Sequence, residues 1–250
     1  MFTKQTIKDI DLKGKTVLLR ADYNVPLEKG KITDDYRIKM SLPTVKFLHE
    51  QASKLIICSH LGRPKNAQDK EFSLAPVAKR LSQLLDKKVE FVDDCVGKKV
   101  SDAVKKLPEK GILLLENVRF YPEEEANDKV FAKKLASKAD VFVQDGFGVV
   151  HRAHASTEAI THFLPSVAGE LLEREVDTIT NAMQNPERPL MAIVGGAKIS
   201  DKIELLEKLI PLADVIALGG AMANPFLAAQ GHDVAKSLIE KSDIPLAKEI

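Results

Sequence analysis

Four short, mostly apolar runs in the first 155 residues constrain the fold more than any other feature of the sequence. They comprise residues 16–20, 54–58, 111–115 and 140–143. Longer segments with apolar residues at helical spacing alternate with them, at residues 36–51, 73–85, 100–107 and 129–137. Strands that alternate with helices are typical of βαβ units. We therefore expect an α/β domain in three layers, α/β/α, with a mostly parallel sheet covered by helices on both faces.

Each of the four runs is followed by a motif with basic or amide side chains. The motifs are ADYNVP, SHLGRP, ENVRF and DGFGVVHRAH. The carboxyl ends of parallel strands meet at one edge of a sheet, which is where open α/β sheets bind ligands. This edge would bring together His60, Arg63, Arg119 and Arg152. Because guanidinium groups match carboxylate and phosphate in shape, the pattern predicts a site for a small, multiply charged anion.

Charge and cysteine content argue against several other classes of protein. The 250 residues contain 37 Lys and Arg against 36 Asp and Glu, so we expect no nucleic-acid partner and no anionic membrane. Cys58 and Cys95 form no CxxC pair, which fits a reducing, cytoplasmic location, and Cys58 is expected to be a buried, inert thiol. The N-terminus lacks the apolar core of a signal peptide, and no apolar stretch approaches the roughly 20 residues of a membrane helix.

Three other motifs admit two interpretations each. HRAHAST places two imidazoles and a guanidinium within four residues, but without further ligands nearby we expect anion binding by Arg152 and no metal site. Arg37, at a predicted helix start, either pairs with Asp34 or Asp35 or turns toward the anion site. The acidic run PEEEAND suggests paired carboxylates for acid–base work or, as we favour, a solvated helix start.

The last third of the chain predicts a separate unit. Residues 168–184 form a long amphipathic pattern, and the segment NPERP after it would end a helix. We predict a first domain at 1–167, a connecting helix at 168–187 and a second α/β domain at 188–250, with strands at 190–194 and 215–218. Because a two-stranded sheet cannot bury both faces, we expect the second domain to be incomplete, in a fragment of a longer protein. The alternative is a unit that borrows a partner.

Two glycine pairs in the second domain follow the predicted strands. In VGGAKISDKIELLEKL, Gly195 and Gly196 would let backbone N–H groups approach a phosphate, with Lys198 and Lys202 in reach of a polyphosphate. The helix begins either before Lys198, which puts both lysines on one face, or after Ser200 as its N-cap. The motif is not a Walker A sequence, so an ordinary tight turn is the alternative. The second pair, in GGAMANPF, either shapes a pocket for a base or ribose or forms a plain turn.

Taken together, these motifs resemble the signatures of phosphoglycerate kinase. RADYNVP, ITDDYRI, SHLGRPK, LLLENVRFYPEEE, DGFGVVHRAHAST and GGAKISDKIELLEKL occur in the family's order and at its separations. The resemblance covers residues 13–250. It implies two Rossmann-like domains joined by a helix, of which this chain would hold the N-terminal domain, the hinge helix and the start of the nucleotide-binding domain. The implied activity is reversible phosphoryl transfer from 1,3-bisphosphoglycerate to ADP, giving 3-phosphoglycerate and ATP in glycolysis.

The same resemblance assigns roles to individual residues. Positions that match the family's catalytic residues are Arg37, Lys198 and Lys202. Those that match residues binding the glycerate substrate are Asp22, Asn24, Arg37, His60, Arg63, Arg119 and Arg152. Those that match nucleotide-binding residues are Gly196, Lys202, Gly219 and Gly220. The resemblance also implies Mg²⁺ bound with ADP or ATP, its protein ligand lying outside these residues, and a monomer in the cytoplasm.

The sequence departs from the family's usual pattern at Gln144, Gly146, Ala221 and Pro225. Gly146 would loosen a loop near the substrate, whereas Ala221 and Pro225 would narrow the nucleotide pocket. Three interpretations stay open. The chain is a phosphoglycerate kinase, a truncated and inactive fragment that binds 3-phosphoglycerate only, or a different nucleotide-dependent α/β enzyme with the same layout.

Overall fold

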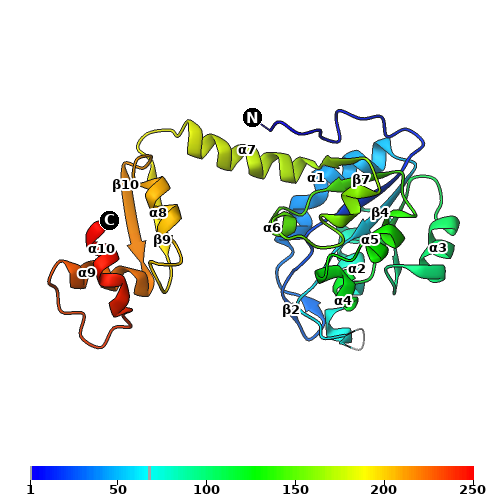
Figure 1. Ribbon diagram of the computed structural model, residues 1–250. Helices are drawn as coiled ribbons and strands as arrows, with labels where there is room; N and C mark the ends of the chain where they lie inside the picture. The colour runs from blue at the N-terminus through cyan, green and yellow to red at the C-terminus, as the bar shows by residue number, and fades with distance from the viewer. Residues whose placement is uncertain (1, 67–68) are drawn as a thin grey trace. The chain divides into compact units, whose positions relative to one another are not determined.

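The computed structural model describes residues 2–66 and 69–250, and the chain divides into two compact units. The division falls between Asp177 and Thr178, inside helix α7 (Glu170–Gln184) (Figure 1). This point lies within the segment predicted as the connecting helix. The three-part assignment at 1–167, 168–187 and 188–250 stays a prediction.

A six-stranded parallel sheet forms the centre of the first unit, in the order β5-β6-β4-β1-β7-β8. The strands are β1 (Thr16–Arg20), β4 (Lys54–Cys58), β5 (Val89–Val92), β6 (Gly111–Leu115), β7 (Val141–Gln144) and β8 (Ser166–Ala168). Three of the predicted strands have the expected bounds, and the fourth is shifted by one residue. The four strands that carry the basic motifs are neighbours, in the order β6-β4-β1-β7, so their carboxyl ends lie side by side.

Alternate residues of the central strands face two separate cores. On β1, Val17 and Leu19 join one core, and Leu18 joins the other. Helices α1 and α2 pack on the first face, and α3 and α5 pack on the second. Their bounds are α1 (Tyr36–Gln51), α2 (Ala75–Leu85), α3 (Gly97–Lys106) and α5 (Lys129–Ala136). The inner strands are buried on both faces, which explains why their runs are mostly apolar, and the predicted three-layer architecture is confirmed.

Short elements occupy the loops of the first unit. Strands β2 (Leu27–Glu28) and β3 (Lys31–Ile32) form a small antiparallel hairpin. The remaining helical turns are η1 (Lys70–Phe72), η2 (Val118–Phe120), α4 (Pro122–Glu125), α6 (Phe147–Val150) and η3 (Ala159–His162). The turns η2, α4 and α6 follow the carboxyl ends of β6 and β7, and they therefore shape the edge at which the basic motifs meet.

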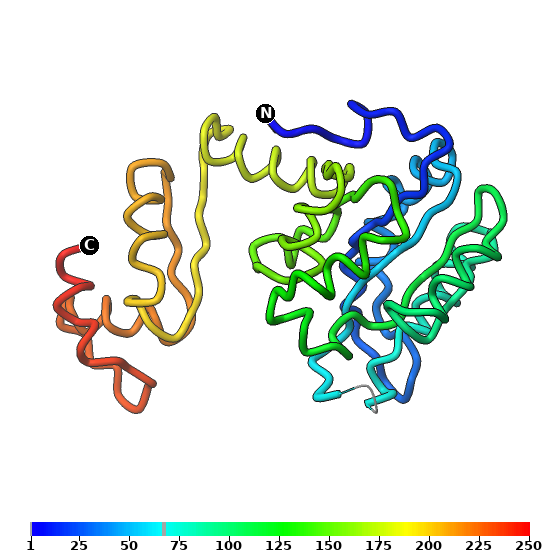
Figure 2. Tube along the Cα trace, turned by 45° about the vertical axis from the view of Figure 1, so that its right-hand side comes forward, coloured from blue at the N-terminus to red at the C-terminus, as the bar shows by residue number. Residues whose placement is uncertain are grey.

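The N-terminal segment extends the sheet beyond β8 and can be followed in dark blue in Figure 2. Thr6 forms a parallel bridge with Ala168, the Ile7 amide donates to the Ala168 carbonyl at 3.0 Å, and the Ala168 amide donates to the Gln5 carbonyl at 2.9 Å. Ala168, the last residue of β8 and the partner of Thr6, lies two residues before α7 begins. These contacts therefore hold the start of α7 at the edge of the sheet.

The second unit contains a two-stranded parallel sheet of β9 (Met191–Gly195) and β10 (Val215–Gly219). Its helical elements are α8 (Ile203–Leu209), η4 (Gly220–Met222), α9 (Ala223–Ala229), η5 (Lys241–Asp243) and α10 (Ile244–Glu249). Val194, Leu206 and Met222 belong to its small core. Ile193 is 78% exposed, because a sheet of two strands has only one face covered in these residues.

Candidate anion-binding site

The carboxyl edge of the large sheet contains a pocket of about 350 Å³. It lies within the first unit, and its lining comes from the loops after β1, β4, β6 and β7 together with the first turn of α1. The lining residues are Asp22, Asn24, Arg37, His60, Gly62, Arg63, Arg119, Gly148, Val149 and Arg152. All seven residues that the family resemblance associates with the glycerate substrate therefore surround one pocket. Four guanidinium groups face a single carboxylate, so the pocket is strongly positive.

Asp22 holds Arg37 at the wall of the pocket through an ion pair between Oδ2 and Nη1. Arg37 therefore does not pair with Asp34 or Asp35, the partners offered by its local sequence. Asp22 Oδ1 also accepts the Asn24 amide at 3.2 Å, and Asn24 Oδ1 accepts the Gly62 amide at 2.8 Å. These contacts tie the loop after β1 to the loop after β4, which fixes the shape of the pocket.

Arg119 is a buried, preorganised member of the pocket, with only 9% of the residue exposed. Its Nη1 donates to the Gly62 carbonyl at 2.8 Å, and its Nε pairs with Glu125 Oε1 at 3.0 Å. Burial lowers the pKa of the guanidinium, which Glu125 opposes and Arg152 reinforces. An arginine side chain is not deprotonated in proteins, so Arg119 keeps its positive charge.

Arg63 and Arg152 differ from Arg119 in having no hydrogen bond or ion pair from their guanidinium groups within residues 2–66 and 69–250. Arg63 is exposed and Arg152 is half-buried. Their donors are free to bind an anion without first breaking an internal contact. The pocket thus combines a rigid side, built by Arg119 and the Asp22–Arg37 pair, with two unengaged guanidinium groups.

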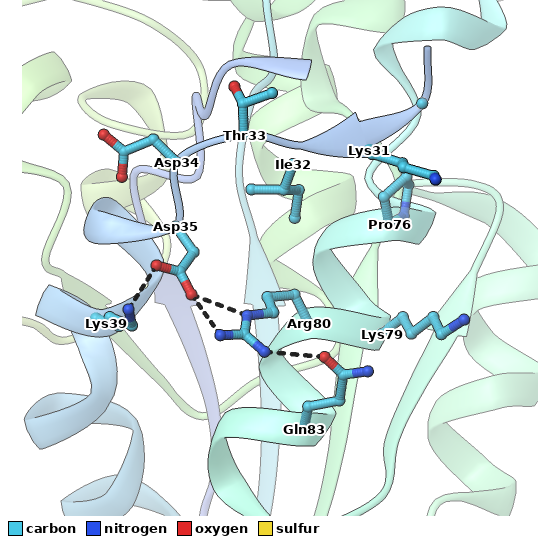
Figure 3. A pocket seen from close by; sticks show the side chains of 11 residues that line it. Lys31, Ile32, Thr33, Asp34, Asp35, Lys39, Pro76, Lys79, Arg80 and Gln83 are labelled. Carbon is cyan, nitrogen blue, oxygen red and sulfur yellow. Dashed lines mark hydrogen bonds and ion pairs between the residues drawn. The ribbon is translucent and has the colours of Figure 1, made fainter. Parts of the chain in front are cut away.

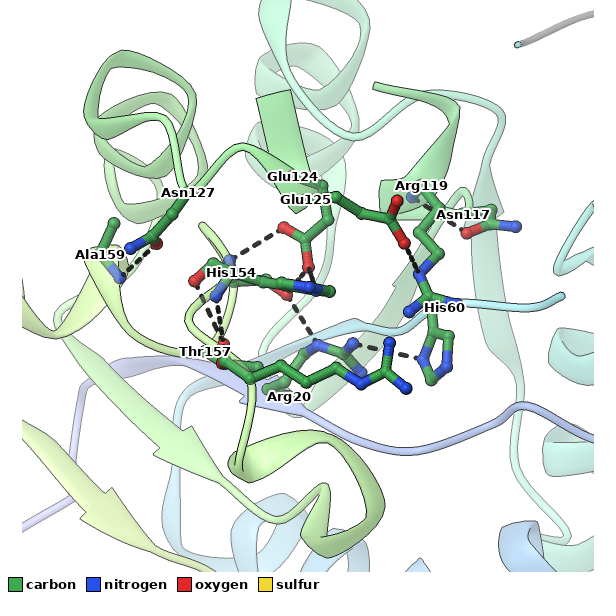
Figure 4. Close-up of polar contacts among 12 residues, drawn as sticks. Arg20, His60, Asn117, Arg119, Glu124, Glu125, Asn127, His154, Thr157 and Ala159 are labelled. Carbon is green, nitrogen blue, oxygen red and sulfur yellow. Dashed lines mark hydrogen bonds and ion pairs between the residues drawn. The ribbon is translucent and has the colours of Figure 1, made fainter. Parts of the chain in front are cut away.

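His60 is buried in the pocket lining beside Arg20, an arginine that does not itself line the pocket (Figure 4). Arg20 Nη2 lies 3.3 Å from His60 Nδ1. A guanidinium can only donate, so Nδ1 must accept and the imidazole proton must sit on Nε2. Arg20 therefore favours the tautomer in which His60 donates a hydrogen bond from Nε2. An anion accepts hydrogen bonds, so this tautomer suits an anionic ligand.

Arg20 is fixed in turn by a buried carboxylate that the sequence did not suggest (Figure 4). Its Nε donates to Ser156 Oγ at 2.8 Å, and Ser156 Oγ and N donate to Glu124 at 2.5 and 2.9 Å. Glu124 lies in the PEEEAND run and is 0% exposed, so the expectation of a solvated helix start is wrong for this residue. Glu123 and Glu125, on either side, are exposed as expected.

The environment of His60 predicts that its ring does not titrate at physiological pH. Burial, reinforced by Arg20 and Arg119, lowers the pKa of His60 to about 2. In the unfolded chain the ring takes up its proton near pH 6.5. The stability associated with neutral His60 is therefore present above pH 6.5 and is lost as the pH falls toward 2. Nitrogen-15 NMR should show an Nε2-protonated ring with constant shifts from pH 5 to 8. Movement of those shifts within this range would contradict the assignment.

A larger cavity of about 750 Å³ lies elsewhere in the first unit, between β3, α1 and α2 (Figure 3). Asp35 occupies its centre and accepts hydrogen bonds from Arg80 Nε and Nη2 at 2.8 and 2.7 Å. Lys39 pairs with the other oxygen of Asp35 at 2.8 Å, and Arg80 also donates to Gln83 at 3.0 Å. The cavity is lined by two carboxylates, Asp34 and Asp35, against four cations, and Asp35 already engages two of them, so it suits an anion less well than the smaller pocket, where a single carboxylate faces four guanidinium groups.

The second unit places its two glycine pairs at the adjacent carboxyl ends of β9 and β10. Gly196 O accepts the Met222 amide at 3.0 Å, and a Cβ on Gly220 would lie 2.9 Å from the same oxygen. Gly219 has nothing within 4 Å of a Cβ. Gly196, Gly219 and Gly220 are therefore brought together at one edge of the small sheet, where backbone can approach a ligand closely.

The two lysines of this unit lie in the turn before α8. Both alternatives for the helix start, before Lys198 or after a cap at Ser200, are wrong, since α8 begins at Ile203 and Lys202 is the residue before it. The buried Asp243 explains the late start, because its Oδ2 accepts the Ile199 amide at 2.9 Å and holds the turn outside the helix. Lys198 pairs with Glu240 at 3.6 Å, and Lys202 is exposed. Lys198 and Lys202 thus do not share a helical face.

No group of three or more His, Cys, Asp or Glu side chains in residues 2–66 and 69–250 is placed to hold a metal ion. None of their helices combines the length and the apolar character needed to cross a bilayer. Cys58 and Cys95 are both buried and free, and burial raises the pKa of Cys58 to about 12, as expected of an inert thiol.

The geometry defines a parallel α/β protein with a positively charged pocket at the carboxyl edge of its sheet, and comparison with known proteins identifies the family. The family model for phosphoglycerate kinase matches residues 7–250. The chain belongs to the phosphoglycerate kinase family. Phosphoglycerate kinases of Akkermansia muciniphila and Moorella thermoacetica are 53% and 51% identical to it over 99% of its length. The chain spans 62% and 63% of the length of these two relatives.

Solved structures give the same result. The phosphoglycerate kinase of Coxiella burnetii superposes with a TM-score of 0.86 at 41% identity, covering 99% of this chain and 62% of that one. The enzyme of Pyrococcus horikoshii superposes with a TM-score of 0.84 at 31% identity, covering 98% of this chain and 64% of that one.

Proposed function

We propose that this chain takes part in the reaction of phosphoglycerate kinase, the reversible transfer of a phosphoryl group from 1,3-bisphosphoglycerate to ADP. The single observation that carries the proposal is the convergence of seven family-matching residues on one pocket. A glycerate phosphate bears a carboxylate and a phosphate on a short chain. Four guanidinium groups and the Nε2–H of His60 offer donors for both, and Asp22 and Asn24 offer acceptors for the hydroxyl.

The nucleotide would bind in the second unit. We propose that Gly196, Gly219 and Gly220 let the backbone approach ADP or ATP and that Lys202 binds its phosphates. The residue types fit this role, because glycines at adjacent strand ends leave room and a lysine supplies charge. When bound with the nucleotide, Mg²⁺ would neutralise phosphate charge. The described residues offer no cluster of ligands for it, so it would arrive with the nucleotide.

The proposed chemistry needs positioning and charge neutralisation rather than a base. In the direction of ATP use, the attacking carboxylate carries no proton, so no side chain has to remove one. The proposed roles of Arg37, Lys198 and Lys202 are to neutralise the charge of the phosphoryl group during transfer. Asp22 supports this role for Arg37 by holding its guanidinium at the pocket wall. We further propose that the protein acts as a monomer in the cytoplasm.

Calorimetric titration of the chain with 3-phosphoglycerate tests the first half of this proposal. Saturable binding that inorganic phosphate does not match at equal concentration supports recognition of the glycerate substrate. No binding by a chain that still unfolds cooperatively would refute it. Production of ADP from MgATP and 3-phosphoglycerate tests the second half, and binding without such production would identify the chain as a glycerate-binding module.

Gly148 gives a sharp test of the pocket wall. A Cβ at this position would lie 2.5 Å from Asp22 Oδ2 and 3.6 Å from Arg37 Nη1. Gly148→Ala should therefore push Asp22 and Arg37 out of place and weaken 3-phosphoglycerate binding about tenfold or more. Gly219→Ala is the control, because a Cβ there meets nothing within 4 Å. Equal affinities for the two variants would show that the Asp22–Arg37 pair does not shape the ligand site.

A further inference from the structure

Asp145 connects the sheet edge to the pocket through its backbone. It follows β7 directly and is 1% exposed. Its amide donates to the Arg20 carbonyl at 2.9 Å, and its carbonyl accepts the Phe147 amide at 3.2 Å, where α6 begins. Two residues of α6, Gly148 and Val149, line the anion pocket. The backbone of Asp145 therefore sets the start of the turn that forms one wall of the pocket.

The side chain of Asp145 points instead to the first turn of α7. Its Oδ1 accepts the Leu171 and Leu172 amides at 2.9 and 3.1 Å, two of the amides that a helix leaves without an internal partner. Thr44 Oγ1 accepts a third, the Glu170 amide, at 3.0 Å. The fit is tight, because a Cβ on Gly169 would lie 2.3 Å from Asp145 Oδ1. A residue distant in sequence thus performs the capping that a local side chain usually provides.

Burial of the Asp145 carboxyl group is energetically unfavourable. Its Oδ2 has no hydrogen-bond partner within residues 2–66 and 69–250. Burial raises the pKa of Asp145 to about 7, and the two amides and the nearby Thr44 hydroxyl oppose this rise. The titratable groups that face it are Glu170 on α7, whose charge adds to the rise, and the buried phenol of Tyr23 after β1.

The rise in the pKa of Asp145 argues that this carboxyl group does not serve only to stabilise the fold. The unfolded carboxyl ionises near pH 4 and the folded one near pH 7, so Asp145 increasingly disfavours folding as the pH rises between these values. An Asn at this position could accept the same two amides without that cost. The carboxylate offers a stronger, charge-assisted hold on the positive end of a helix.

We propose that Asp145 is a positioning residue that locks the first turn of α7 to the pocket-forming turn α6. The helix α7 leads from the first unit into the second, and the pocket wall is attached to its cap. Loosening the cap should therefore disturb the pocket, and a ligand in the pocket should stabilise the cap. The ligand part of this proposal rests on the proposed binding of 3-phosphoglycerate, but the coupling between α6 and α7 does not.

Amide hydrogen exchange by NMR in three variants tests the lock. Asp145→Leu removes the oxygen that accepts the Leu171 and Leu172 amides. Asp145→Asn keeps an accepting oxygen but removes the negative charge. Asp140→Leu is the control. Asp140 stands just before the other end of β7 and accepts the Thr16 amide at 2.8 Å, away from α7. Exchange is followed at the α7 amides Leu171 and Leu172 and at the α6 amides of residues 149 and 150, alongside 3-phosphoglycerate affinity.

Asp145→Leu should speed exchange at both turns about tenfold or more and weaken 3-phosphoglycerate binding, whereas Asp140→Leu should change neither. In the parent chain, protection of Leu171 and Leu172, corrected for intrinsic rates, should fall as the pH rises from about 4 to about 7, because an opening that exposes the Asp145 carboxyl group lets it ionise. Asp145→Asn should restore most of the protection and abolish this pH dependence.

Unchanged α7 protection in a cooperatively folded Asp145→Leu chain would overturn the proposal. So would faster exchange in α7 with no change in α6, because the two turns would then be independent. If Asp145→Leu does not fold, Asp145→Asn decides, since retention of the parent pH dependence in that variant would refute the role of this carboxyl group. If the parent chain does not bind 3-phosphoglycerate, the proposed function fails while the exchange data still test the lock.

Discussion

Glu124→Ala is expected to destabilise the first unit by about 3–5 kcal/mol, the usual cost of removing one partner from a buried charge network. Glu124 is 0% exposed and accepts two hydrogen bonds from Ser156. The Ser156 hydroxyl in turn accepts a hydrogen bond from Arg20 Nε. Without the carboxylate, the buried Arg20 loses the anion to which Ser156 links it. The effect should be measured by urea unfolding followed by tyrosine fluorescence. The three tyrosines, Tyr23, Tyr36 and Tyr121, all lie in the first unit, and the chain has no tryptophan.

Glu123→Ala is the matched control for this loss. It removes an exposed carboxylate from the same short helix and should change stability by no more than about 0.5 kcal/mol. Similar values for the two variants would mean that the network through Ser156 is not a structural element. The Glu124→Ala chain should also show a changed His60 tautomer, because Arg20 would no longer be held beside Nδ1.

Arg63→Ala should lower the affinity for 3-phosphoglycerate about 10- to 100-fold, because a hydrogen bond to a charged group contributes about 1.5–3 kcal/mol. Its guanidinium has no hydrogen bond or ion pair within the described residues, so its removal breaks no such contact there. Stability should therefore stay within about 0.5 kcal/mol of the parent chain. Calorimetric titration and urea unfolding of the same preparation separate the two effects.

Lys65→Ala provides the control for charge alone. Lys65 is exposed in the same loop, two residues beyond Arg63, and it does not line the pocket. Its removal should weaken binding only slightly, and this difference should disappear as salt screens the surface. An Arg63→Ala chain that binds as tightly as Lys65→Ala would place the ligand outside the pocket.

The sheet could be predicted well because its inner strands are apolar on both faces and are separated by amphipathic helices. Strands β5 and β8 escaped prediction for opposite reasons. Glu90 interrupts the short run of β5, and β8 has only three residues, whose extended form depends on pairing with β7. The start of α8 was misjudged because Asp243, distant in sequence, captures the Ile199 amide.

The candidate site could be predicted to the extent that its residues follow strand ends. A strand end fixes position on the sheet edge, so His60, Arg63, Arg119 and Arg152 could be grouped from the sequence alone. Their supports could not. Glu124 is buried against Ser156, which lies 32 residues further along the chain. Arg20 is the last residue of an apolar run, a position at which an arginine is usually exposed to solvent. Only the folded chain shows that these groups meet.

A crystal structure of the chain soaked with 3-phosphoglycerate would test the central claim most directly, namely that the strand-end residues of the first unit form one cradle for this anion. We expect the ligand in the pocket of about 350 Å³, with its phosphate and carboxylate contacting guanidinium groups among Arg63, Arg119 and Arg152. Ligand density elsewhere, or an empty pocket at a concentration that saturates the calorimetric signal, would contradict the account.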